Sequence, residues 1–121
     1  MTHAQRRALA TLWGRFGVDV SIAPLDPATL FERRAPLVLE IGFGDGESLA
    51  VMASADPMVN YLGMEVHRPG IGHLLLRAEA LALTNLRIMY ADAVGVLERQ
   101  TPDECLDRAQ IFFPDPWPKV R

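Results

Sequence analysis

Apolar residues recur at two different spacings along this chain, and each spacing predicts a different element. Near the amino end they follow the 3.6-residue period of a helix at Leu9, Leu12, Trp13 and Phe16. We therefore expect an amphipathic helix over 4–16, ended by Gly17, that packs on the main domain. A proline-rich connector with a short turn at 28–31 follows it.

From residue 37 onward, short apolar runs alternate with helical patterns. The runs have the length of strands and occupy 37–41, 61–66, 87–90 and 109–113. Helical patterns follow the first three runs, over 46–55, from Pro69 to about 84, and over 93–99. This alternation predicts an α/β fold, in which a parallel sheet with right-handed crossovers and flanking helices binds its ligand outside the carboxyl ends of the strands.

Composition fits one compact domain. The chain has 121 residues, half of them hydrophobic, and a net charge of −3, so no overall basic field indicates a nucleic-acid partner. The single cysteine, Cys105, cannot form an internal disulfide, which fits a reducing compartment. No apolar run near the amino end is long enough for a signal sequence or a membrane span. We expect a cytoplasmic protein without a membrane partner.

The first strand runs directly into three alternating glycines, Gly42, Gly44 and Gly46, at the point where a helix opens. Glycine tolerates a positive φ and has no Cβ, so backbone N–H groups in such a turn can approach a ligand closely. The following helix adds the positive end of its dipole. The stretch therefore predicts a nucleotide-type cofactor site.

Glu40 narrows the choice of cofactor. It lies inside the strand, two residues before the first glycine, and the spacing G-x-G-x-G differs from the dinucleotide fingerprint G-x-G-x-x-G. A carboxylate there favours a cation and would repel the pyrophosphate of a nicotinamide dinucleotide. S-adenosylmethionine (SAM) carries an ammonium and a sulfonium, and is the cofactor that the residues favour.

One acidic residue stands at or near the end of each expected strand: Glu40, Glu65, Asp92 and Asp115. A carboxylate that closes the second strand suits the vicinal hydroxyls of a ribose, a role shared by NAD and SAM sites. An acid after the third strand would meet the amino group of an adenine. The sequence thus predicts that a single nucleoside lies across the strand ends.

Three prolines surround Asp115 and Trp117 in a stretch that follows the last apolar run. Prolines restrict the unfolded chain, so such a loop can present side chains at a lower entropic cost. An aromatic face and a carboxylate acceptor together would suit a purine drawn out of its stack. An ordinary turn residue remains the alternative for Asp115.

At these residues the chain resembles the bacterial tRNA (guanine-7-N)-methyltransferase family. The resemblance is carried by L-E-I-G-F-G-D-G at 39–46, Y-L-G-M-E-V-H-R-P-G at 61–70, N-L-R-I-M-Y-A-D-A at 85–93 and Q-I-F-F-P-D-P-W-P-K at 110–119. It implies a Rossmann-like class I methyltransferase fold that transfers the SAM methyl group to guanine N7 in the tRNA variable loop.

The resemblance also implies roles for individual residues. The cofactor site would be lined by Glu40, Glu65, Asp92 and Asp115, in addition to Gly42, Gly44 and Gly46 of the glycine stretch. Asp115 would also be catalytic and Lys119 a tRNA or substrate contact, and the aromatic face of Trp117 makes it a further candidate substrate contact. His67 and His73 lack a further ligand at metal spacing, so no metal is expected.

Family members continue beyond the position of Arg121, so we expect a C-terminally truncated member with only the first four strands of the fold. The expected organisation is an amino-terminal helix and connector over 1–35 and the first half of the SAM-binding domain over 36–121. Impaired activity is expected of these residues alone. Two alternatives remain: a noncatalytic SAM-binding fragment, and a nicotinamide-dependent oxidoreductase domain, which the glycine spacing and Glu40 disfavour.

Overall fold

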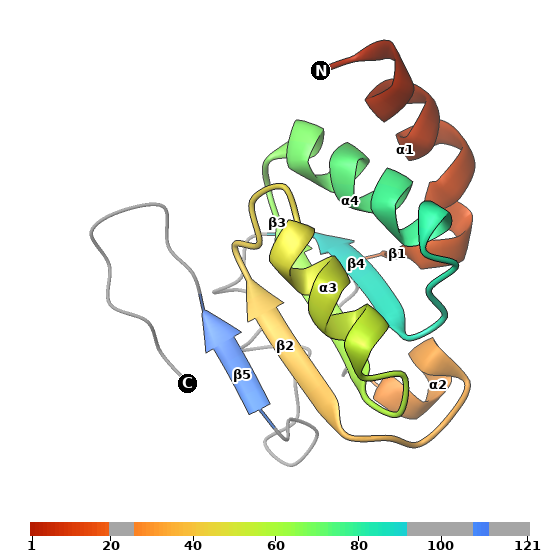
Figure 1. The fold of residues 1–121 in the computed structure, drawn as a ribbon, viewed down its shortest axis with the longest axis vertical. Coiled ribbons are helices and arrows are strands. Elements are labelled where there is room, and N and C mark those ends of the chain that lie inside the picture. Colours follow the sequence, from red (N-terminus) through yellow and green to blue (C-terminus); the bar gives the residue numbers. More distant parts are fainter. Residues whose placement is uncertain (20–25, 92–107, 112–121) are drawn as a thin grey trace.

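The computed structural model describes residues 1–19 and 26–91 in full and the backbone of 108–111 (Figure 1). Its elements are α1 (His3–Phe16), β1 (Gly17–Val18), α2 (Pro27–Phe31), β2 (Leu37–Ile41), α3 (Glu47–Ala55), β3 (Asn60–Glu65), α4 (Arg68–Ala80), β4 (Leu86–Tyr90) and β5 (Arg108–Ile111). The helix expected over 93–99 lies outside the described residues.

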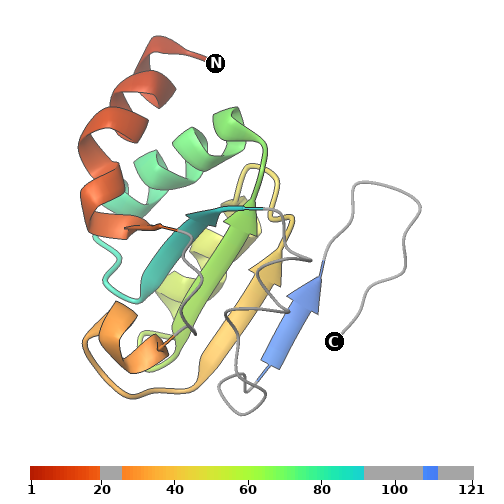
Figure 2. The same cartoon turned by 180° about the vertical axis from the view of Figure 1, so that it is seen from behind.

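All pairings in the sheet are parallel, and the strand order is β1-β4-β3-β2-β5 (Figure 2). From β2 the chain moves to β3 and then β4 on one side, while β5 pairs with β2 on the other side. The direction of winding therefore reverses at β2. In open α/β sheets such a reversal leaves a ligand-binding crevice at the carboxyl ends of the strands.

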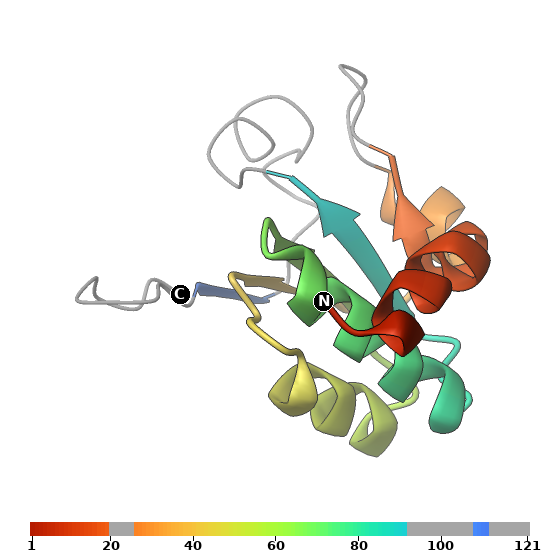
Figure 3. The ribbon, with the colours of Figure 1, turned by 90° about the horizontal axis from the view of Figure 1, so that it is seen from above.

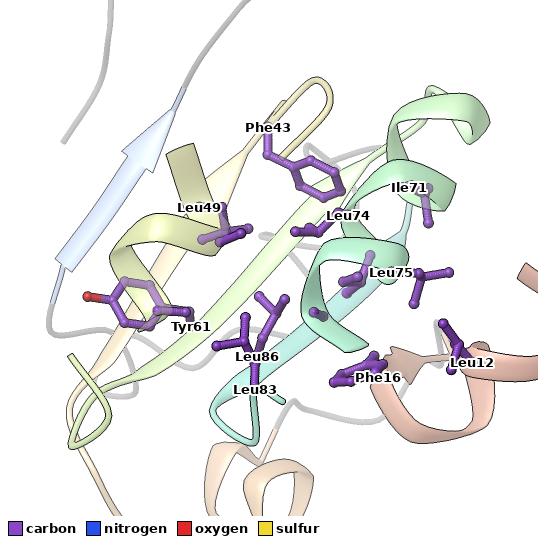
Figure 4. Packing of buried hydrophobic residues seen from close by; sticks show 14 of the residues in the cluster. Leu12, Phe16, Phe43, Leu49, Tyr61, Ile71, Leu74, Leu75, Leu83 and Leu86 are labelled. Carbon is purple, nitrogen blue, oxygen red and sulfur yellow. The ribbon is translucent and has the colours of Figure 1, made fainter. Parts of the chain in front are cut away.

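Two apolar clusters cover the two faces of the sheet. On one face lie α3 and α4, with α1 packed against α4 (Figure 3). Figure 4 shows Leu49, Leu74 and Phe16, one from each of these helices, pointing into a common cluster. On the other face, Phe31 of α2 packs in a second cluster that includes Leu39 of β2. All five residues of β2 are buried, as expected of a central parallel strand covered on both faces.

The helix ends follow ordinary capping rules. Thr2 and Gln5 form a reciprocal capping box at the start of α1, with hydrogen bonds of 3.1 and 2.9 Å. Pro69 occupies the first turn of α4, where its missing N–H is not needed. Helix α3 stops before Pro57, at Ala55, because the residue before a proline is driven out of the helical region.

The predicted parallel α/β architecture is confirmed, and the strands agree with the predicted ranges to within two residues. The sequence analysis missed β1, a two-residue strand in which Gly17 pairs with Ile88 of β4. Such a short strand has no apolar periodicity of its own and exists through its pairing. No helix among the described residues has the length and apolar character needed to cross a membrane.

Candidate cofactor-binding site

The loop between β2 and α3 forms a tight turn at the carboxyl edge of the sheet. Gly42, Gly44 and Gly46 have φ values of 74°, 67° and 79°, a region that side chains with a Cβ rarely adopt. The Gly42 N–H donates to the Met64 carbonyl of β3 at 2.8 Å, and the Gly46 N–H donates to the Phe43 carbonyl at 3.1 Å. The loop is thus built from a backbone conformation that its glycines make accessible.

The carboxylate of Glu65, at the end of β3, closes over this loop. Its Oε1 accepts a hydrogen bond of 2.7 Å from the Gly44 N–H. Its Oε2 accepts from the N–H groups of Val66 and His67, at 2.9 and 3.1 Å. Bonds between a carboxylate and backbone N–H groups are charge-assisted and strong. Glu65 therefore joins the glycine loop to the segment that leads into α4.

Helix α4 packs directly against the same loop. A Cβ on Gly70 would overlap the Gly44 carbonyl oxygen, and one on Gly46 would lie 2.7 Å from the Cβ of Leu74. The loop and α4 are therefore in direct contact with no room for added atoms. Sequence reasoning missed the role of Gly70, although a glycine directly after Pro69 in a first helical turn was an available signal.

Glu40 is a buried acid in the centre of the sheet. Its register neighbours are Gly63 of β3 and Gln110 of β5, and its side chain is 2% exposed. Its Oε2 has no hydrogen-bond partner among the residues that the structure describes, and burial raises the pKa of the Glu40 carboxyl to about 7. An unpartnered buried carboxylate is costly unless a cation or a donor compensates it. Glu40 is thus suited to a positively charged ligand.

A second polar cluster fixes the start of α3 to α4. Glu47 Oε1 lies 3.0 Å from His73 Nε2 and 2.9 Å from Arg77 Nε. All three side chains are partly exposed, so screening by solvent limits the strength of these contacts. The cluster holds α3, which begins directly after the glycine loop, in place on α4. This contact of His73 was not predicted from the sequence, which indicated only that His73 lacks a further ligand at metal spacing.

The structure brings together five of the predicted cofactor residues, which are Glu40, Gly42, Gly44, Gly46 and Glu65. Asp92, Asp115, Trp117 and Lys119 lie outside the described residues. Within 1–19 and 26–91, no three histidine, cysteine or acidic residues are grouped so that they could hold a metal ion.

The sheet is parallel, and the direction in which the chain adds strands reverses at β2, where a glycine loop with positive φ values follows the strand. These features define a Rossmann-like α/β domain. A family model described as "Putative methyltransferase" matches residues 34–121. The chain belongs to this methyltransferase family.

Curated relatives match the whole chain, and two of them show the level of similarity. Both are named tRNA (guanine-N(7)-)-methyltransferase: one from Nitrosococcus oceani is 55% identical over 121 residues, and one from Halorhodospira halophila is 56% identical over 122 residues. The chain covers 51% and 53% of these proteins, respectively. It therefore spans about half the length of the curated relatives that it matches.

Solved structures share the fold at low sequence identity. The 16S rRNA methyltransferase KamB gives a TM-score of 0.58 at 22% identity, over 73% of this chain and 41% of that chain. A SAM-dependent methyltransferase from Geobacter sulfurreducens, in complex with S-adenosyl-L-homocysteine, gives 0.53 at 22% identity, over 89% of this chain and 43% of that chain. The Rossmann-like methyltransferase fold expected from the sequence is confirmed.

Proposed function

We propose that this chain contributes the cofactor-binding part of a SAM-dependent methyltransferase that methylates N7 of guanosine in tRNA. The observation that carries the proposal is Glu40, a buried carboxylate in the strand that leads into the glycine loop, one oxygen of which has no partner within the described part of the chain. The names of the relatives from Nitrosococcus oceani and Halorhodospira halophila supply the substrate. Because tRNA is a cytoplasmic substrate, we place the protein in the cytoplasm.

The two carboxylates at this site fit SAM better than a nicotinamide dinucleotide. Glu40 would face the cationic part of the cofactor and Glu65 its ribose hydroxyls. A carboxylate offers about four acceptor positions, and the backbone N–H groups of Gly44, Val66 and His67 occupy three of those on Glu65, so one stays free for a hydroxyl donor. The pyrophosphate of NAD would be repelled by the carboxylate of Glu40, whereas Glu65 suits a ribose in either cofactor.

Bound SAM would supply an electrophilic methyl group on a sulfonium. Guanine N7 carries a free lone pair and needs no deprotonation, so the chain needs no strong general base. Its residues must instead align the purine and offset the positive charge that develops on it. We assign the orienting and charge-balancing role to Asp115, adenine recognition to Asp92, and contacts with tRNA to Trp117 and Lys119.

Methyl transfer can be tested directly with the 121-residue chain. The protein is incubated with isotopically labelled SAM and an unmodified tRNA transcript, and the nucleosides are then separated and weighed by mass spectrometry. The proposal predicts labelled 7-methylguanosine from the variable loop, in a low yield because impaired activity is expected of these residues alone. Asp115→Asn should lower turnover strongly with SAM affinity intact, while the control Asp103→Asn should leave turnover unchanged.

Each other outcome has a defined meaning. Label on a different atom or base would contradict the N7 assignment. Full turnover by Asp115→Asn would contradict the role of Asp115. SAM binding without any transfer would favour the noncatalytic module over the enzyme, and binding of NAD without SAM would favour the oxidoreductase.

A further inference from the structure

A groove lies between α1 and α4, outside the glycine loop and its acids. Its deeper part has a volume of about 300 Å³ and is lined by Leu9, Trp13, Arg68, Ile71 and Tyr90. Tyr90 is 50% exposed and Trp13 is partly buried against the core. Two aromatic side chains and an arginine therefore share one hollow.

A shallower hollow of about 530 Å³ continues from it along α1. Leu9 and Arg68 line both hollows, and the second adds Met1, Arg6 and Ala10. We call the two together the α1–α4 groove. Helix α1 packs against α4 (Figure 2), and side chains of both helices line the groove.

The α1–α4 groove borders the candidate cofactor site. Tyr90 is the register partner of Glu65 in the sheet, and Arg68 begins α4 three residues after Glu65. Both therefore stand at the carboxyl edge of the sheet, where the glycine loop also lies. A ligand in the groove would lie beside a bound cofactor, without using the same side chains.

The charge of the groove is opposite to that of the whole chain. The chain has a net charge of −3, yet no acidic residue is among the described residues that line either hollow. Arg6 and Arg68 are exposed, and neither makes an ion pair with another residue in the described part of the chain. The nearby carboxylate of Asp19 lies 3.4 Å from Trp13 Nε1 and meets the edge of the indole.

We propose that the α1–α4 groove binds a single-stranded segment of the RNA substrate. Arg6 and Arg68 would contact phosphates, and a base would stack on the exposed ring of Tyr90, beside Trp13, whose indole packs on Gly17. Arginines beside aromatic faces are the combination that proteins use for unpaired nucleotides, since phosphate and base are then bound together. This inference rests on the proposed function, because the substrate proposed there is an RNA.

An acidic peptide would satisfy the two arginines but would leave the aromatic faces without a matching group. RNA fills both kinds of contact, and the groove is continuous enough to take a base and the neighbouring phosphate. The test must therefore measure separately how much the arginine charges and the aromatic stacking contribute to tRNA affinity.

The charge contribution is measured by fluorescence anisotropy with a labelled, unmodified tRNA at several salt concentrations. Removal of one arginine–phosphate interaction should reduce the salt dependence, as the slope of log K against log salt, by about 0.7 to 0.9. Arg6→Ala with Arg68→Ala should reduce that slope by about 1.5 and weaken binding about tenfold or more at low salt. The control is Arg34→Ala, which removes one positive charge at an exposed residue before β2, and it should change neither quantity appreciably.

The stacking contribution is measured at Tyr90, because its exposed ring can be truncated without opening the core. Tyr90→Ala should weaken tRNA binding about fivefold or more with an unchanged salt slope, as expected when one base no longer stacks on an aromatic ring. Tyr90→Phe keeps the ring and should restore the affinity of the parent chain. Circular dichroism of each variant confirms that it is folded.

Unchanged tRNA affinity in the double arginine variant, or no tRNA binding by the parent chain at low salt, would overturn the inference. Equal displacement of tRNA by polyglutamate and by a single-stranded RNA of the same charge would also overturn it, in favour of an acidic partner. These results are distinct from a failure of the proposed function, which is judged by SAM binding and by 7-methylguanosine formation and involves no groove residue.

Discussion

The carboxylate of Glu65 accepts a hydrogen bond of 2.7 Å from the backbone N–H of Gly44, a residue 21 positions earlier in the chain. The acid assigned to the cofactor ribose is therefore also the acid that holds the glycine loop. If Glu65 binds the ribose as proposed, loop geometry and cofactor recognition are coupled through one side chain, and a change at Glu65 should affect both.

Glu65→Gln should weaken binding of S-adenosylhomocysteine by about tenfold or more. Glutamine has nearly the same shape but lacks the charge and one acceptor, so the loop loses charge-assisted hydrogen bonds worth about 1.5 to 3 kcal/mol each. Isothermal titration calorimetry measures the affinity. The control Glu79→Gln alters a half-exposed acid on α4 whose contact with Arg15 spans 3.9 Å, and it should bind the ligand as the parent does. Equal affinities for both variants would contradict the assigned role.

Two glycines that lie in helices offer a matched test of the contact between α4 and the loop. A Cβ on Gly70 would overlap the Gly44 carbonyl, whereas a Cβ on Gly14 of α1 would meet nothing within 4 Å. Alanine is favoured over glycine inside a helix by about 1 kcal/mol. Gly14→Ala should therefore raise the free energy of unfolding by up to that amount, while Gly70→Ala should lower it and weaken ligand binding. Urea unfolding measures the free energy of unfolding of both variants. A more stable Gly70→Ala variant would show that the loop is not packed on α4.

Glu40 should make the stability of the protein depend on pH. Burial raises the pKa of its carboxyl to about 7, above the ordinary value of 4.5, so the folded state binds more protons between these values. The free energy of unfolding should therefore fall as pH rises from about 4.5 to about 7, by about 3 kcal/mol, and then level off. Glu40→Gln should remove this fall. Chemical denaturation across the pH range measures it, and a pH dependence that persists in the variant would assign it to another group.

The same acid should act in the opposite direction on ligand binding. A cation is attracted by the ionised form of Glu40, so affinity for SAM should rise as pH increases toward 7 and beyond. Glu40→Gln should weaken SAM binding at pH 8 by at least about tenfold while making the protein no less stable. A variant that loses neither affinity nor its dependence on pH would place the cationic part of the cofactor elsewhere.

Asn85 lies just before β4, at the edge of the sheet opposite the glycine loop. We expect it to affect the stability of the fold but not ligand binding. Its buried amide Nδ2 carries two hydrogens and lies 2.9, 3.0 and 2.9 Å from the carbonyl oxygens of Ala53, Asp56 and Val59, so two of these acceptors share a hydrogen. Asn85→Ala would leave these acceptors without their donor, which costs about 1 to 3 kcal/mol. Thermal unfolding should show this loss, while Thr84→Ala, at the exposed neighbouring residue, should change little.

The sequence predicted the parallel sheet and the glycine loop because their signals are local. Strands β2 and β3 are short apolar runs, and a run of glycines after a strand constrains the backbone wherever it occurs. Glu40 and Glu65 were predicted as cofactor residues from their positions near strand ends. In both cases the sequence showed an acidic residue near the carboxyl end of one strand, where parallel sheets bind ligands.

The contacts between distant segments could not be predicted in the same way. The bond from Gly44 to Glu65 and the contact between Gly44 and Gly70 depend on how tightly α4 packs on the loop, which no local pattern encodes. Strand β1 depends likewise on its pairing with β4. The α1–α4 groove combines side chains from α1, α4 and β4, so it appears only once the fold has brought these elements together.

The proposed SAM site can be tested by calorimetric titration of the folded chain at pH 8 with S-adenosylhomocysteine, which carries the nucleoside and the ammonium of SAM, and with NAD as the parallel ligand. The site should bind S-adenosylhomocysteine with micromolar affinity, about −8 kcal/mol, and should not bind NAD. A chain that is folded by circular dichroism but binds NAD instead, or binds neither ligand, would contradict the proposed SAM site.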